Sequence, residues 1–159
     1  MAMRHDGFSM MELMAVLAVI AILALLAIPN FTDKIIRDQI VESLPLADIA
    51  KAPIAGSWAT TRTFPVDNAA AGLPAADKIV NNLIRSVSIR EGAIDITYGN
   101  SAHALIKDKT LTMRAAVVED SPVVPVTWVC GNAAAPDPMT MRGGNNTNIP
   151  AGYLPLKCR

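Results

Sequence analysis

One carboxylate, that of Glu12, lies in a run of 21 residues from Phe8 to Ile28 that holds no other charge. A charged carboxylate in a hydrophobic span costs on the order of 2.5–3.5 kcal/mol at the bilayer centre and less near an end. Such a group needs a partner, and no Lys or Arg lies within helical reach on its C-terminal side. A cut between Gly7 and Phe8 would place a new α-amino group one helical turn from Glu12, at the positive end of the helix dipole. Pairing with an amine is therefore the chemistry that this segment could perform.

The apolar run from Phe8 to Ile28 has competing interpretations. As a helix it would be about 31 Å long, close to the thickness of the hydrocarbon core of a bilayer. A cleaved secretory signal needs a basic start and a small-residue cleavage site, whereas here Arg4 supplies little charge and Ala24 and Ala27 have the wrong spacing. A buried core helix is disfavoured because the remaining chain is too small to surround it. A plain anchor explains the length, and on charge alone an anchor with Glu12 at the headgroup level remains an open alternative.

The stretch from Gly7 to Met14 resembles the processing site of the prepilin family. It has a glycine, an aromatic residue, three further residues and a glutamate at the head of a hydrophobic helix. Pro29 follows Phe8 by 21 residues, where pilins also commonly carry a proline. The short leader, residues 1–7, is similar to that of the type IVa class.

The resemblance implies that an inner-membrane aspartyl peptidase cuts after Gly7 and methylates the amine of Phe8. It also implies that Glu12 pairs with the Phe8 amine of a neighbouring subunit during assembly. The sequence departs from the family at Asp6, where Lys or Arg is usual. This departure would slow processing or orient the precursor less firmly.

The only two cysteines, Cys130 and Cys158, lie near the C-terminus. An even count in an exported domain fits one disulfide, and two free thiols are the alternative. Without a Cys-x-x-Cys motif or a nearby His they make a poor zinc site. A bond between them would stabilise the fold by about 3.6 kcal/mol through loop closure. It would close a loop of residues 131–157, a tail rich in Pro, Gly and Asn that has little capacity to pack by itself. The residues around both cysteines, 128–131 and 153–159, resemble the ends of the disulfide-bounded loop of type IVa pilins.

After Pro29 the pattern predicts an amphipathic helix that continues the apolar run with a kink. Its apolar stripe recurs at three- and four-residue steps: Phe31, Ile35, Ile36, Ile40 and Leu44. Pro45 and Pro53 are expected to bend or interrupt this helix, which should end before Thr60–Pro65.

The remaining chain predicts a small antiparallel sheet. Alternating apolar residues from Val87 to Tyr98 flank a turn at Glu91-Gly92, which indicates a hairpin. Thr110–Val118 and Val123–Cys130 supply two more strands, and a short helix is expected over Ala75–Leu83. The predicted fold class is α+β, a long N-terminal helix packed on about four strands with a C-terminal disulfide loop. The expected divisions are a leader at 1–7, a transmembrane helix at 8–28, an amphipathic helix at 29–62 and a globular head at 63–159.

Charge and composition limit the alternative functions. The net charge is zero with a pI near 6.7, so DNA binding would need a local basic strip. The candidates for that strip are Lys107, Lys109, Arg114, Arg142, Lys157 and Arg159. A type II secretion pseudopilin would often hold calcium, but the tail offers Asp137 as its only carboxylate. No phosphate-binding loop and no arrangement of a nucleophile with His is visible, so no enzyme and no cofactor are predicted.

The sequence thus predicts a structural subunit of a type IV pilus, anchored in the bacterial inner membrane and then assembled into an extracellular helical filament. The expected partners are other copies of the chain, the prepilin peptidase and methyltransferase, and the assembly platform. Surface adhesion, twitching motility and DNA uptake are the activities such a filament supports. A minor or competence pilin that binds DNA and a secretion pseudopilin are the alternatives.

Overall fold

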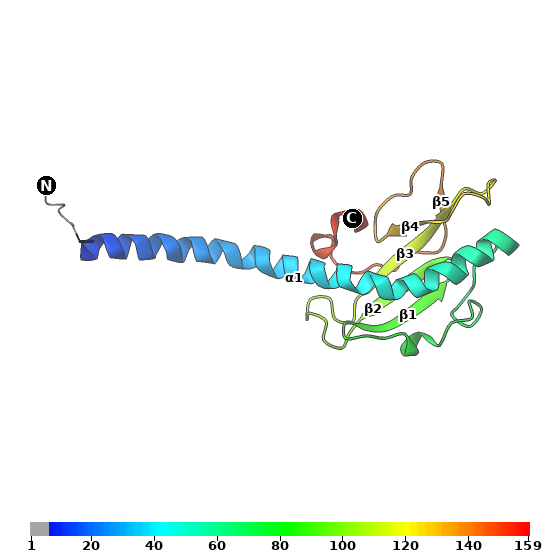
Figure 1. The fold of residues 1–159 in the computed structure, drawn as a ribbon, viewed down its shortest axis with the longest axis horizontal. Helices are drawn as coiled ribbons and strands as arrows, with labels where there is room; N and C mark the ends of the chain where they lie inside the picture. Colours follow the sequence, from blue (N-terminus) through cyan, green and yellow to red (C-terminus); the bar gives the residue numbers. More distant parts are fainter. Residues whose placement is uncertain (1–6) are drawn as a thin grey trace, which may run out of the picture. The chain divides into compact units, whose positions relative to one another are not determined.

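A computed structural model describes residues 7–159 of the chain, and for residues 27–30 it describes the backbone alone. Arg4, Asp6 and most of the expected leader therefore lie outside the described residues. The main elements are one helix, α1 (Met10–Thr61), and a sheet (Figure 1). The strands are β1 (Ile84–Arg90), β2 (Ala93–Tyr98), β3 (Thr110–Val117), β4 (Thr127–Cys130) and β5 (Thr140–Met141). Three short 3₁₀ helices complete the fold: η1 (Ala76–Lys78), η2 (Ala151–Tyr153) and η3 (Leu156–Cys158).

The chain divides into two compact units, one ending at Ile35 and one from Ile36 to Arg159. The second unit, called the head below, contains the sheet and the C-terminal part of α1. Helix α1 is long and apolar enough to cross a membrane, judged by length and composition. It runs without a break through Pro29, Pro45 and Pro53, so of the bend or interruption expected at the last two prolines, the interruption is wrong. A proline leaves the carbonyl four residues earlier without its helical donor, which for Pro45 and Pro53 falls at the exposed residues Val41 and Ile49, where solvent can satisfy it.

The sheet of the head is antiparallel in the order β1-β2-β3-β4, and β5 pairs with the end of β3. The predicted hairpin is confirmed: Arg90 faces Ala93, and Glu91 and Gly92 form the turn with positive φ angles of 49° and 88°. The strand expected from Val123 is shorter than predicted and begins at Thr127, because Pro125 within the missing part has no N–H to donate. The helix expected over Ala75–Leu83 is a single 3₁₀ turn, η1.

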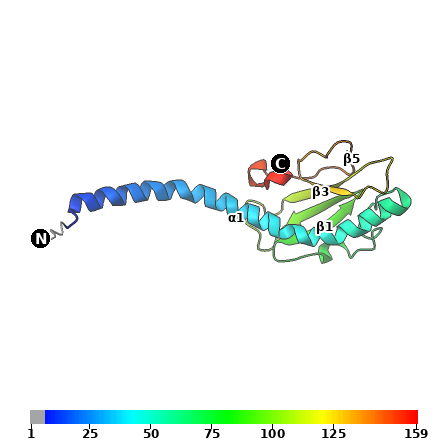
Figure 2. The ribbon, with the colours of Figure 1, turned by 45° about the horizontal axis from the view of Figure 1, so that its top comes forward.

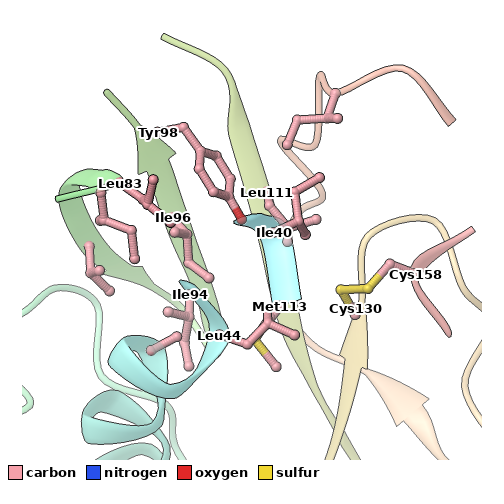
Figure 3. Close-up of a cluster of buried hydrophobic side chains, with 14 of the residues drawn as sticks. Ile40, Leu44, Leu83, Ile94, Ile96, Tyr98, Leu111, Met113, Cys130 and Cys158 are labelled. Carbon is pink, nitrogen blue, oxygen red and sulfur yellow. A yellow bond between two sulfur atoms is a disulfide. The ribbon is translucent and has the colours of Figure 1, made fainter. Parts of the chain in front are cut away.

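The core of the head lies between α1 and one face of the sheet. Figure 3 shows Ile40 and Leu44 of α1 directed at Ile94, Ile96, Leu111 and Met113 of the central strands. The predicted stripe is confirmed from Ile36 onward, since Ile36, Ile40 and Leu44 are buried. Phe31 and Ile35, in the other unit, remain exposed.

Candidate assembly site

The peptide bond between Gly7 and Phe8 lies just before the first turn of α1. Both residues are exposed and in irregular backbone, and the Phe8 side chain keeps 81% of its surface accessible. The bond therefore lies in an accessible segment outside regular secondary structure.

Ser9 and Glu12 cap the first turn of α1 reciprocally. The Glu12 backbone N–H donates to Ser9 Oγ at 3.2 Å, and the Ser9 backbone N–H donates to Glu12 Oε2 at 3.2 Å. The Ser9 hydroxyl also donates to Glu12 Oε2 at 3.3 Å. This is a capping box, which satisfies two amide donors that a helix start leaves without partners. Ser9 was not among the residues predicted from the sequence, although the Ser-x-x-Glu spacing before an apolar run is a known signature of this motif.

Glu12 carries the only charge between Phe8 and Ile28. The next cation along the chain, Lys34, lies about 33 Å further along an α-helix, six turns away. Capping hydrogen bonds orient the carboxylate but do not neutralise it. A counter-charge for Glu12 therefore does not come from the helix on its C-terminal side.

Apolar side chains surround the first part of α1 on every side. In the described part of this segment the large hydrophobic residues are exposed: Phe8, Met10, Met11, Leu13, Met14, Val16, Leu17, Val19, Ile20, Ile22, Leu23, Leu25 and Leu26. A helix that is apolar all round is stable only in lipid or among other helices. Pro29, the other residue expected to act in assembly, lies within α1, and the structure describes only its backbone.

Cys130, at the end of β4, forms a disulfide with Cys158, in η3, across a Cα–Cα distance of 4.5 Å. Both cysteines are buried and belong to the core of the head (Figure 3). The loop that they close packs more than expected, since Ile149 and Leu154 are buried and β5 pairs with β3.

A buried carboxylate that sequence reasoning missed holds this loop against the outer face of the sheet. Asp95 on β2 accepts hydrogen bonds from Thr112 Oγ1 on β3 at 2.6 Å and from Asn146 Nδ2 in the loop at 2.9 Å. Arg90 Nη2 lies 3.3 Å from the same carboxylate. The loop backbone joins the same contact, because the Asn146 N–H donates to Thr112 Oγ1 at 2.9 Å. No local sequence signal identifies Asp95, since Thr112 and Asn146 lie 17 and 51 residues away from it.

The six cations proposed for a DNA-binding strip do not form one set of contacts. Arg142 pairs with Glu119, and Arg114 Nη2 donates to the Gly131 carbonyl at 3.1 Å. Lys107 and Lys109 lie in or beside the loop that joins β2 to β3, whereas Lys157 and Arg159 lie at the C-terminus. The cations are thus distributed over four different segments of the head.

Comparisons with known proteins agree with this architecture. Residues 37–159 match the family model described as pilin, a bacterial filament protein, and residues 2–28 match the prokaryotic N-terminal methylation motif. A type IV major pilin protein, PilE, of Neisseria gonorrhoeae is 30% identical, with 96% of this chain and 93% of that protein covered. The fimbrial protein EcpC of Eikenella corrodens is 31% identical over 96% of this chain and 90% of its own length. A fimbrial protein of Neisseria meningitidis serogroup B is 29% identical, with 96% of this chain and 93% of that protein covered.

Proposed function

This chain belongs to the pilin family, and on that premise we propose that it is a principal subunit of a type IV pilus that polymerises through the helix at residues 8–28. The subunit is anchored in the inner membrane before assembly and is part of an extracellular pilus afterwards. Residues 29–62 continue the helix into the head, residues 63–159 form the rest of the head, and residues 1–7 are a leader that is removed.

The observation that carries this proposal is the single carboxylate of Glu12 on a helix that is otherwise apolar all round. Lipid covers the apolar surface of the helix in a single subunit, and neighbouring helices of the same kind cover it in a filament. The unneutralised charge of Glu12 then favours the one arrangement that brings a cation to it. Burial of a charge without a partner is costly, so the carboxylate makes the packing of helices selective.

Processing supplies that cation. Cleavage between Gly7 and Phe8 creates an α-amino group on Phe8, which is then methylated and keeps its positive charge as a secondary amine. Glu12 pairs with the Phe8 amine of a neighbouring subunit. The capping box survives this cut, because it uses only Ser9 and Glu12.

Intact-mass measurement of the surface form tests the processing step. We expect a chain that begins at Phe8 and carries one added methyl group. A mature chain that begins at Met1 or Ala2 would refute the proposed cleavage. A mature chain that begins at Phe8 without the methyl group would refute the methylation alone.

The role as principal subunit is tested by electron microscopy of cells with and without the gene. Loss of all pili is the expected result, together with loss of adhesion and twitching motility. If pili persisted while DNA uptake was lost, the alternative of a competence pilin would replace this proposal. Two of the six candidate cations, Arg114 and Arg142, are engaged with the Gly131 carbonyl and with Glu119, and the pilin relatives give no support to a secretion pseudopilin.

A further inference from the structure

Two segments of the head flank α1 at the point where the chain enters the head. On one side, the His103 N–H in the loop between β2 and β3 donates to Gln39 Oε1 at 2.9 Å. On the other side, Arg37 Nη2 donates to the Gly152 carbonyl in the C-terminal turns at 2.7 Å. Residues two apart on a helix point about 200° apart, so the two segments lie on opposite sides of α1. Figures 1 and 2 show the red C-terminal turns beside α1 at this end of the head.

Each segment carries an exposed leucine next to exposed cations. Leu156 keeps 84% of its surface accessible and is followed by Lys157 and Arg159, which are also exposed. Leu105 keeps 43% accessible and is followed by the exposed Lys107. We call these five residues the basal surface. Leucine at the acyl boundary with lysine and arginine among the headgroups is the pattern of proteins that lie on an anionic membrane.

The acidic groups at this end of the head leave a surplus of positive charge. Asp108 lies within the loop but pairs with Arg85 at 2.7 Å. Other acidic groups near the two segments are the exposed Asp38 and Glu42 on α1 and the terminal carboxylate of Arg159. Asp48, which lines a pocket together with Lys157, pairs with Lys51 at 2.7 Å. The cations at the same end of the head are Lys107, Lys157 and Arg159 of the basal surface and the half-buried Lys109. The basal surface therefore suits an anionic partner.

The length of chain between the apolar run and the head limits how far apart they can lie. The run ends at Ile28 and the head begins at Ile36. Eight residues span about 12 Å as a helix and at most about 29 Å when fully extended. This length sets an upper limit on the distance between the end of the apolar run and the point where the chain enters the head.

We propose that the basal surface binds the anionic phospholipid headgroups of the membrane that holds the subunit before assembly. Lys107 and Lys157 contact lipid phosphates, and Leu105 and Leu156 enter the boundary between headgroups and acyl chains. Arg159, whose guanidinium also donates to the Leu154 carbonyl at 3.1 Å, adds positive charge beside Lys157. This contact is separate from the filament role, since a subunit extracted from the membrane must release it.

Hydrogen–deuterium exchange on the mature full-length protein in lipid nanodiscs tests the proposal. Amides of residues 101–109 and 151–159 should exchange about fivefold more slowly in nanodiscs containing phosphatidylglycerol than in nanodiscs of phosphatidylcholine alone. High salt should remove this difference, because headgroup attraction is screened. The double variant Leu156→Ser/Lys157→Glu should lose the protection at 151–159.

The matched control is Val123→Ser/Lys78→Glu, which changes an exposed apolar residue and an exposed lysine elsewhere on the head. It should keep the full lipid-dependent protection. Lys107→Glu, in the other segment, should lose protection at 101–109 and tests the proposal without altering the C-terminal turns. Equal exchange in both lipids, or unchanged protection in both basal variants, would overturn it. Protection by a DNA duplex in place of anionic lipid would also overturn it and assign the surface to nucleic acid.

Discussion

The Thr112 hydroxyl donates to Asp95 Oδ1 at 2.6 Å, between directly opposed residues of β3 and β2. Their neighbours along the strands, such as Ile94 and Leu111, point into the core against α1. The Asp95–Thr112 pair therefore lies on the opposite face of the sheet, where side chains usually meet water. Here the disulfide loop covers the pair through Asn146, so a polar contact attaches this loop to the sheet.

Replacing Asp95 by alanine should destabilise the head by about 2–4 kcal/mol. The change removes a charged acceptor and leaves the buried Thr112 hydroxyl and the Asn146 amide of the loop without it, which costs more than the loss of an exposed hydrogen bond. Urea unfolding of the mature protein in detergent micelles, with the disulfide intact, measures this change. Faster hydrogen exchange at residues 143–148 should accompany it.

Asp48→Ala is the control for that substitution. Asp48 pairs with Lys51 at 2.7 Å, but its side chain is 58% exposed. Exposed helical pairs contribute little, so the free energy of unfolding should change by less than about 0.5 kcal/mol. Similar losses for the two variants would show that the Asp95 contacts do not hold the loop.

Gly143→Ala should destabilise the head by about 2–4 kcal/mol. Gly143 has a φ of +76°, and an added Cβ would lie 2.7 Å from the Ala93 backbone nitrogen. The substitution thus combines left-handed strain with overpacking against the sheet. Gly72→Ala separates the two effects, since Gly72 has a similar φ of +69° with open space around it. Gly72→Ala should cost only about 1 kcal/mol in the same unfolding measurement. An equal cost at both positions would mean that the loop containing Gly143 moves away from Ala93 freely.

Stability should fall as the pH rises from about 10 to about 12. Burial raises the pKa of Tyr98 to about 12, and the Ser43 hydrogen bond at 2.6 Å opposes this shift by a smaller amount. The folded state keeps the phenol proton at a pH where the unfolded chain has lost it. The stabilisation that comes from keeping this proton is therefore complete below pH 10. It is lost as the pH rises through 12, which lowers the free energy of unfolding by roughly 2–3 kcal/mol.

Tyr98→Phe isolates that effect. The variant removes the titrating group, while Ser43 retains the Ile40 carbonyl at 2.6 Å as an acceptor. It should unfold about 1 kcal/mol more easily at pH 7. The difference from the wild type should shrink or change sign between pH 10 and 12, measured from urea midpoints at each pH. A constant difference would contradict the assigned protonation of Tyr98.

Local patterns in the sequence predicted much of the fold. The hairpin followed from alternating residues around Glu91-Gly92, because one face of each strand must be buried. Spacing of three and four residues predicted which side of α1 packs on the sheet, and Ile36, Ile40 and Leu44 confirm it. The Cys130–Cys158 pairing expected from an even count of cysteines and from the resemblance is also present.

Features that depend on contacts between distant residues were not predictable in this way. The polar composition of the tail predicts little packing. Its order comes instead from Asp95, which no periodicity marks, and from Ile149 and Leu154, whose burial depends on the disulfide and the sheet. The candidate assembly residues were found through family resemblance and charge, whereas the capping role of Ser9 needed the structure.

Glu12 has two separable properties, its charge and its capping hydrogen bond, and substitutions can divide them. Glu12→Gln keeps an acceptor for the Ser9 N–H, because glutamine also closes a capping box, but it removes the charge. Ser9→Ala keeps the charge and removes the hydroxyl that accepts from the Glu12 N–H, at a cost of about 1 kcal/mol in helix stability.

If the charge of Glu12 recruits the Phe8 amine of a neighbouring subunit, Glu12→Gln should be cleaved normally but should form few filaments, as should Glu12→Ala. Ser9→Ala should form filaments at close to the normal yield. Intact mass gives the extent of cleavage, and the amount of sheared pili relative to membrane-bound subunit gives assembly. Normal assembly of Glu12→Gln together with failure of Ser9→Ala would assign the role of Glu12 to helix capping and would exclude the intersubunit ion pair.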